Sequence, residues 1–113
     1  MAFIDSSYFI GEINILNAWS ETELSQAIDQ YEKEILTQLL GYKLYSLLIA
    51  DCTLYVPETQ KYLDLVNGKE FTHTFAGESI TLKWEGFKNT SKISLIAYYV
   101  FYKLLERNVT RLY

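Results

Sequence analysis

Hydrophobic residues follow the period of an α-helix from position 24 onward. Ser20 and Glu23 have the spacing of a capping box, in which each side chain binds the other residue's amide at the start of a helix. The apolar stripe then continues at spacings of three and four residues through Leu24, Ile28, Tyr31, Ile35 and Leu39. Gly41 suits the left-handed position just past a helix end. The pattern predicts a helix that begins at Ser20 and ends before Gly41.

Two shorter apolar groups follow this first helix. Three leucines predict a second helix that packs back on the first and ends near Asp51; they are Leu44, Leu47 and Leu48. A brief third helix is expected to begin near Pro57, since proline is common in the first turn of helices, and to end before Gly68. Its small apolar face consists of Tyr62, Leu63 and Val66.

Residues 69–84 change to the alternating pattern of paired β-strands. Two alternating runs, 71–75 and 80–84, flank a short segment that contains Gly77, and this arrangement predicts a β-hairpin. With Gly77 at the first central position of a type II′ turn, the register pairs Phe75 with Ile80, His73 with Leu82 and Phe71 with Trp84. All six side chains then lie on one face of the hairpin.

The first 18 residues predict an extended N-terminal arm. Counting every second position between Tyr8 and Ile15 places Phe9, Ile13 and Ile15 on one side of an extended strand. Two interpretations are open: the arm packs on its own domain, or it docks on a neighbouring subunit.

The last helix is predicted from Asn89, a favourable N-cap residue, to Arg107. Within residues 93–105 only Ser94 and Lys103 are not apolar, so this helix is hydrophobic on all sides. A domain of this size can enclose only part of such a helix. We therefore expect some of its aromatic side chains to reach the surface or another chain; they are Tyr98, Tyr99, Phe101 and Tyr102.

The order of these elements predicts a mainly α fold of the α+β class. The 113 residues are expected to form one domain, a small bundle of about four helices with one β-hairpin and an extended N-terminal arm. The expected segments are the arm at 1–18, helices within 20–66, the hairpin at 69–84 and a central aromatic-rich helix at 89–107.

Charge and composition exclude several classes of function. Ten Lys and Arg residues against fourteen Asp and Glu give a net charge of −4, and the basic residues are dispersed, which argues against direct binding of nucleic acid. The longest apolar run, Leu95 to Tyr102, is far shorter than the ~20 residues of a membrane span. Cys52 is the only cysteine, and the first residues lack the features of a secretion signal, so we expect synthesis in the cytoplasm.

Candidate catalytic residues are few and isolated. His73 is the only histidine and lies among apolar positions of the predicted hairpin, so we expect it to be structural. Cys52 has no basic neighbour within four residues to lower the pKa of its thiol. The carboxylates Asp29, Glu32 and Glu34 are interpreted as a solvated helix face. The sequence therefore predicts no catalytic residue, no metal site and no cofactor.

Four segments of ordinary residues, without catalytic signatures, are spread over most of the chain: Tyr8–Ile15, Ile28–Glu34, Leu39–Tyr42 and Lys83–Val100. Together they resemble proteins encoded in the structural gene clusters of tailed bacteriophages and prophages, which are similar in size and helical layout to head–tail connector (adaptor) proteins. The resemblance implies a non-enzymatic virion protein that assembles as a ring between the portal and the tail. Connectors of this kind are expected to continue further beyond the last helix than Tyr113.

The surplus of aromatic residues agrees with this implication. Ten Tyr, six Phe and two Trp make 18 aromatic side chains in 113 residues, and those outside the core are available for subunit contacts. The candidate interface consists of Phe9, Ile13, Ile15, Tyr98, Tyr99, Phe101 and Tyr102. The expected partners are copies of the same chain and phage portal or tail proteins, first in the bacterial cytoplasm and then in the virion. A bacterial interaction domain unrelated to phage is the alternative function, with an enzyme a distant third.

Overall fold

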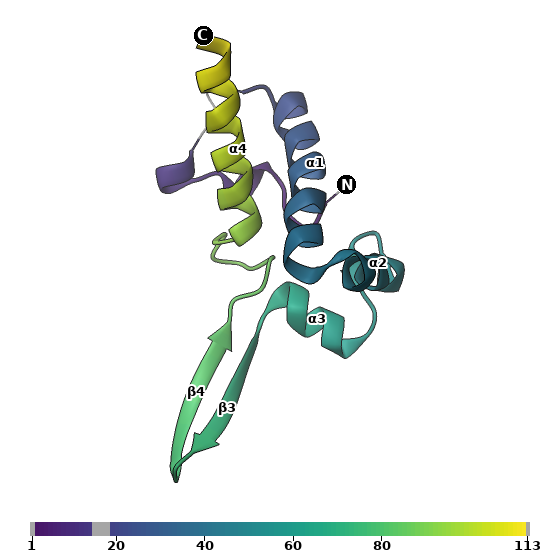
Figure 1. Cartoon of the computed structure of the whole chain (residues 1–113), viewed down its shortest axis with the longest axis vertical. Coiled ribbons are helices and arrows are strands. Elements are labelled where there is room, and N and C mark those ends of the chain that lie inside the picture. The colour runs from purple at the N-terminus through teal and green to yellow at the C-terminus, as the bar shows by residue number, and fades with distance from the viewer. Residues whose placement is uncertain (1, 15–18, 113) are drawn as a thin grey trace.

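The chain forms a mixed α/β fold in which 56% of the residues are helical (Figure 1). This computed structural model describes residues 2–14 and 19–112, and residues 108–112 by their backbone alone. The described residues form two short 3-10 helices, four α-helices and two small antiparallel sheets of two strands, which agrees with the predicted α+β class. In chain order the elements are η1 (Ser6–Tyr8), η2 (Gly11–Ile13), α1 (Glu21–Leu40), α2 (Tyr42–Asp51), β1 (Cys52–Thr53), β2 (Val56–Pro57), α3 (Gln60–Asn67), β3 (Lys69–Phe75), β4 (Glu78–Trp84) and α4 (Leu95–Leu112).

Helix α1 begins and ends where the sequence predicts. The Ser20 hydroxyl caps it by accepting a hydrogen bond from the Glu23 amide at 3.1 Å. Gly41, with a φ of +82°, ends the helix and precedes α2. Leu39, in the last turn, is 51% exposed, whereas the rest of the predicted stripe is buried: Leu24, Ile28, Tyr31 and Ile35.

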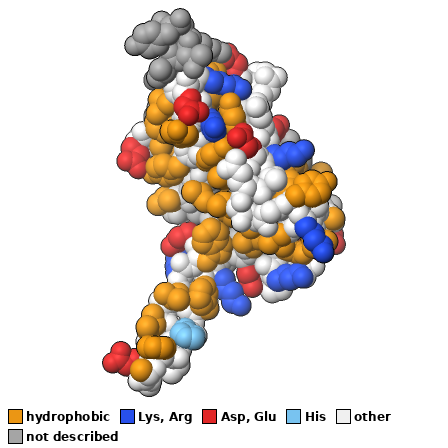
Figure 2. Space-filling view, viewed as in Figure 1, with side chains coloured by type: hydrophobic (Ala, Val, Ile, Leu, Met, Phe, Trp, Pro, Cys, Tyr) orange, Lys and Arg blue, Asp and Glu red, His pale blue; other side chains and the backbone are white. Residues whose placement is uncertain are grey.

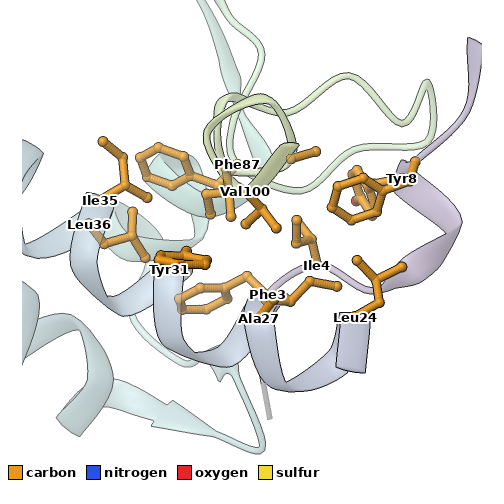
Figure 3. Packing of buried hydrophobic residues seen from close by; sticks show 14 of the residues in the cluster. Phe3, Ile4, Tyr8, Leu24, Ala27, Tyr31, Ile35, Leu36, Phe87 and Val100 are labelled. Carbon is orange, nitrogen blue, oxygen red and sulfur yellow. The ribbon is translucent and has the colours of Figure 1, made fainter. Parts of the chain in front are cut away.

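The core lies where α1, α4 and the segment before α1 meet (Figures 1 and 3). Helices α1 and α4 pack against each other, and the N-terminal segment crosses them. Phe3 and Ile4 lie beside Ala27 of α1, with Val100 of α4 facing them (Figure 3). The N-terminal segment is therefore an integral part of the core.

The predicted extended arm is not observed in residues 2–14. The chain instead makes the two 3-10 turns η1 and η2, and the Asp5 carboxylate caps η1 by accepting a hydrogen bond from the Ser7 amide. Phe9 is fully buried and Ile13 is 3% exposed, both within the core of this chain. An extended strand would also place Phe9 and Ile13 on one side, but the 3-10 turns rise only ~2 Å per residue, so the segment is shorter and stays against its own core. Ile15 lies outside the described residues.

Strands β3 and β4 form a hairpin that projects from the helical body (Figure 1). Ala76 and Gly77 form its two-residue turn, with φ values of +52° and +81°, as in a type I′ turn. The predicted register is therefore wrong by two residues: Phe75 pairs with Glu78, His73 with Ile80, Phe71 with Leu82 and Lys69 with Trp84. Because the shift is even, the predicted set of apolar side chains still shares one face.

Helix α4 begins at Leu95, six residues later than predicted from Asn89. The Asn89 side chain does not cap a helix; its Oδ1 accepts from the Ile93 amide, and its Nδ2 donates to the carbonyls of Ile93 and Glu85. Lys92 has a φ of +62°, which no α-helix can contain. The buried Ser94 hydroxyl then accepts a hydrogen bond from the Ile96 amide, as an N-cap does.

The base of the hairpin is fixed by a close crossing of two chain segments. A Cβ on Gly68 would lie 2.5 Å from the Trp84 carbonyl oxygen, and one on Gly86 would lie 2.5 Å from the Gly68 nitrogen. The indole N–H of Trp84 donates to the carbonyl of Leu65 at 2.7 Å, and the Phe87 amide donates to the carbonyl of Val66 at 2.8 Å. These contacts attach the hairpin rigidly to α3.

Candidate interaction surface

Helix α4 has two opposite apolar faces, of which one is buried and one is exposed. The buried face packs into the core and consists of Ile96, Ala97, Val100 and Leu104. The exposed face is a row at spacings of three, four and three residues, which we call the α4 stripe: Leu95, Tyr98, Tyr102 and Leu105, between 40% and 55% exposed. Of the four aromatic residues predicted on this helix, Tyr98 and Tyr102 are exposed, and Tyr99 and Phe101 are half-buried against the core.

Tyrosine hydroxyls at this helix are already hydrogen-bonded within the chain. The Tyr98 hydroxyl donates to Glu12 of η2, and this bond raises the pKa of Tyr98 above its usual value. The Tyr99 hydroxyl donates to Glu34 of α1 at 2.9 Å, and the Lys103 ammonium lies 5.5 Å from the centre of the Tyr99 ring. These bonds hold α4 against α1 and the N-terminal segment, and they fix the position of the α4 stripe.

A second exposed apolar surface lies on the hairpin. Eight side chains share one face by register, and its five large apolar ones, which we call the hairpin face, are Phe71, Phe75, Ile80, Leu82 and Trp84, between 37% and 68% exposed. Lys69, His73 and Glu78 lie on the same side. The opposite face is polar and contains threonines, Ser79, Glu70 and Lys83. Figure 2 shows hydrophobic side chains along the hairpin, with the single histidine among them. Sequence reasoning grouped these residues on one face, but it did not include them in the candidate interface.

Helix α2 exposes further apolar residues. Leu48 is fully buried, but Leu44 and Leu47 are 39% and 50% exposed, so only one of the three leucines packs back on the body as predicted. Tyr42 is 77% exposed at the first position of the helix. Leu44 and Leu47 are neighbours one helical turn apart, whereas Tyr42 lies on another side of α2, so this apolar row is shorter than the α4 stripe.

A cleft of about 750 Å³ lies at the base of the hairpin, between the strand ends and the loop before α4. Four lysines line it together with Tyr8 and Trp84; they are Lys69, Lys83, Lys88 and Lys92. Lys69 pairs with Asp64 at 3.5 Å, Lys83 lies 3.8 Å from Glu85, and the Lys92 ammonium lies 4.6 Å from the centre of the Tyr8 ring. Three of the four cations therefore already have partners within the chain.

The groups considered for chemistry are dispersed in the fold. His73 is exposed on the hairpin, opposite Ile80. The half-buried Cys52 thiol donates to the Leu48 carbonyl at 3.2 Å, and burial raises its pKa, so little thiolate forms at neutral pH. Within residues 2–14 and 19–112, no group of three or more His, Cys, Asp or Glu side chains is arranged to hold a metal ion. A search of the same residues finds no helix with the length and hydropathy of a membrane span.

Glu32 is a buried carboxylate that the sequence interpretation placed, wrongly, on a solvated face. It is 3% exposed, and its Oε1 and Oε2 accept hydrogen bonds from the Phe3 amide at 2.9 and 3.0 Å. A third bond, from the Ile4 amide to Oε1, measures 3.3 Å. Burial raises the pKa of this carboxyl from 4.5 to about 7, against the opposite effect of the amide bonds. A sequence signal existed, because Ile28 and Leu36 lie one helical turn on either side and are both buried.

Comparisons of the chain with protein-family models, with curated proteins and with solved structures find no match. The class of protein that the fold defines is a small α+β domain whose described residues expose apolar side chains on the α4 stripe, on the hairpin face and on α2. Its function is therefore inferred from these surfaces.

Proposed function

We propose that this chain is a non-enzymatic assembly protein of a tailed phage or prophage virion, a head–tail connector subunit that forms a ring. Its contacts would be with copies of itself and with portal or tail proteins, as the sequence resemblance implies. The observation that supports assembly most directly is the α4 stripe, because its four large apolar side chains form a continuous row on the surface, and contiguous apolar patches of this kind often mark interaction sites.

The proposed mechanism of assembly is passive burial of apolar surface. The four exposed side chains of the stripe present roughly 400 Å² of apolar area if a whole large side chain has ~200 Å². At ~25 cal/mol per Å², their burial would contribute about 10 kcal/mol before the losses of association are subtracted. Tyrosine supports such contacts because its ring is rigid and its hydroxyl can bind at the rim. Phe9 and Ile13 are buried in their own chain. Of the candidate interface predicted from the sequence, the proposed contact therefore uses Tyr98 and Tyr102.

The oligomeric state of the purified chain tests this proposal. Size exclusion coupled to light scattering, over a wide range of concentration, should show self-association of the wild-type chain. Tyr102→Ser should weaken it, since Tyr102 is 55% exposed at the centre of the stripe. Tyr42→Ser is the matched control, because it removes the same side chain from a more exposed site on α2. A wild-type chain that stays monomeric, and that binds no portal protein encoded by a neighbouring gene, would contradict the proposal.

Gene neighbourhood separates the phage assignment from the alternative of a bacterial interaction domain. Portal and capsid genes beside this one support the connector, and electron microscopy of the assembled material should then show closed rings. Self-association without such neighbours and without rings would support the alternative, since the same α4 stripe would serve either protein.

A further inference from the structure

We propose that the hairpin face of one copy docks on the α4 stripe of a second copy. This inference depends on the proposed function, self-assembly, and specifies which surfaces meet. The starting observation is that every residue of β3 and β4 is exposed, although one face of the hairpin is apolar. A two-stranded hairpin is at best marginally stable in water unless its apolar face packs on another element.

Within residues 2–14 and 19–112, no element of this chain covers the hairpin face, and we infer that a second copy does. The hairpin extends away from α1 and α4 in a body that measures 57 by 31 by 23 Å (Figure 1). At its base, the backbone at Gly68 and Gly86 crosses so closely that neither position has space for a Cβ. The Trp84 indole, bonded to the Leu65 carbonyl and in edge contact with the Phe87 ring at 5.3 Å, holds the same joint. The hairpin face is thus presented outward at a fixed angle.

The α4 stripe has the dimensions that this face requires. Phe71 and Phe75 are four residues apart on β3, which corresponds to ~13 Å along a strand. Leu95 and Leu105 are ten residues apart on α4, or ~15 Å along a helix. The two apolar rows therefore match in length, and a helix laid across one face of a two-stranded sheet is a stable packing arrangement.

The combined area also fits a stable contact between two copies. The hairpin face presents roughly 500 Å² and the α4 stripe roughly 400 Å², at ~200 Å² for each whole large side chain. Together they supply about 900 Å² of apolar surface. A standard interface buries ~1,600 Å² in total, of which a little under three-fifths is apolar, which is also about 900 Å². The hairpin side of this contact also carries Lys69, His73 and Glu78, and on the α4 stripe the Tyr98 hydroxyl already binds Glu12.

This contact is heterologous, since each copy donates a hairpin and receives one on a different surface. Contacts of this kind repeat from copy to copy and close into a ring when the rotation between copies allows it. The hairpin would act as the link between neighbours in that ring.

Two double variants test the pairing of surfaces. Phe75→Ser/Ile80→Ser removes the hairpin face, and Tyr102→Ser/Leu105→Ser removes the α4 stripe; both change exposed side chains only. Each variant alone should self-associate at least about 100-fold more weakly than wild type. An equimolar mixture should form heterodimers, because the stripe variant retains its hairpin and the hairpin variant retains its stripe. Thr74→Ser/Thr81→Ser, on the polar face of the hairpin, is the control and should associate as wild type does.

Other pairings give different results and would overturn the inference. If hairpins dock on hairpins, the stripe variant still self-associates; if stripes dock on stripes, the hairpin variant does. In either case the wild type assembles, so the proposed function survives while this inference fails. A wild type that stays monomeric contradicts self-docking, and binding of the portal protein by the same chain then decides the proposed function separately.

Disulfide trapping provides an independent readout. In a Cys52→Ser background, Phe75→Cys on one copy and Tyr102→Cys on another should form a mixed disulfide when the two proteins are oxidised together by diamide, which is reduced as the S–S bond forms. Rapid formation of Phe75→Cys homodimers, with no mixed species, would refute the pairing. Circular dichroism of each variant should match that of wild type, which separates lost docking from lost folding.

Discussion

Replacing Glu32 with glutamine should abolish most of the dependence of stability on pH between 4.5 and 7. The carboxyl group is 3% exposed, and burial raises its pKa from 4.5 to about 7. Between these two values the folded chain retains a proton that the unfolded chain has released. Raising the pH through this range therefore favours unfolding.

The size of the effect follows from the difference in pKa. Each pKa unit corresponds to 1.36 kcal/mol, so a change from 4.5 to about 7 removes about 3 kcal/mol of unfolding free energy. This contribution is fully present below pH 4.5 and is lost as the pH rises through 7. Asp5 and Asp51 act in the opposite direction, because hydrogen bonds hold their pKa values below 3.8, and their contributions are lost only at still lower pH.

Urea unfolding at a series of pH values, followed by circular dichroism at low protein concentration, measures the effect. Wild type should lose about 3 kcal/mol across the range, and Glu32→Gln should remain nearly constant. The substituted side chain carries no charge, and its oxygen can accept from Phe3 and Ile4, but its NH2 group replaces Oε2, which also accepts from Phe3. The substitution should therefore change stability by a nearly constant amount at every pH. Glu78→Gln, at the exposed end of the hairpin, should follow wild type. Parallel curves for wild type and Glu32→Gln would refute the reasoning.

Three further predictions concern the core and the joint of the hairpin. Phe9→Ala should lower the unfolding free energy by about 3 to 5 kcal/mol in urea titrations, as expected for a core residue and not for an exposed arm. Gly68→Ala should destabilise the fold more than Gly77→Ala does. Both glycines have a positive φ, but of the two only Gly68 has backbone atoms within 3 Å of a new Cβ. The thermal unfolding temperatures of the two variants measure the difference. Tyr8→Phe should destabilise by about 1 to 3 kcal/mol, because its hydroxyl both donates to the Asn89 carbonyl and accepts from the Asn89 amide, and amide hydrogen exchange at Asn89 should become faster.

Local chemistry made the first helix predictable. Ser20 and Gly41 act through their own backbone neighbours, so their roles can be read from the sequence. Asn89 shows the limit of the same reasoning: its side chain is equally suited to a helix cap and to a loop, and the loop that returns from the hairpin determines which forms. The predicted start of α4 is therefore six residues too early.

The errors elsewhere depend on long-range contacts or on rare conformations. Ala76 adopts a φ of +52°, which is unfavourable for alanine, so the sequence pointed to a turn with only Gly77 left-handed. Glu32 is buried because the N-terminal segment, 28 or more residues away, supplies amides to it. The exposure of Tyr98 and Tyr102 was predictable, because α4 is apolar on all sides and a small domain can enclose only part of such a helix. The exposure of the hairpin face was not, since alternation fixes which side chains share a face but not whether that face is covered.

The contacts between the first and last elements of this fold determine when it can finish folding. The Tyr8 hydroxyl binds Asn89, 81 residues later, and Tyr98 binds Glu12 across 86 residues. Residues 8 and 12 leave the ribosome well before residues 89 and 98 have been made. The core therefore cannot close until most of the chain has been synthesised, and the α4 stripe reaches its final position only once α4 has emerged.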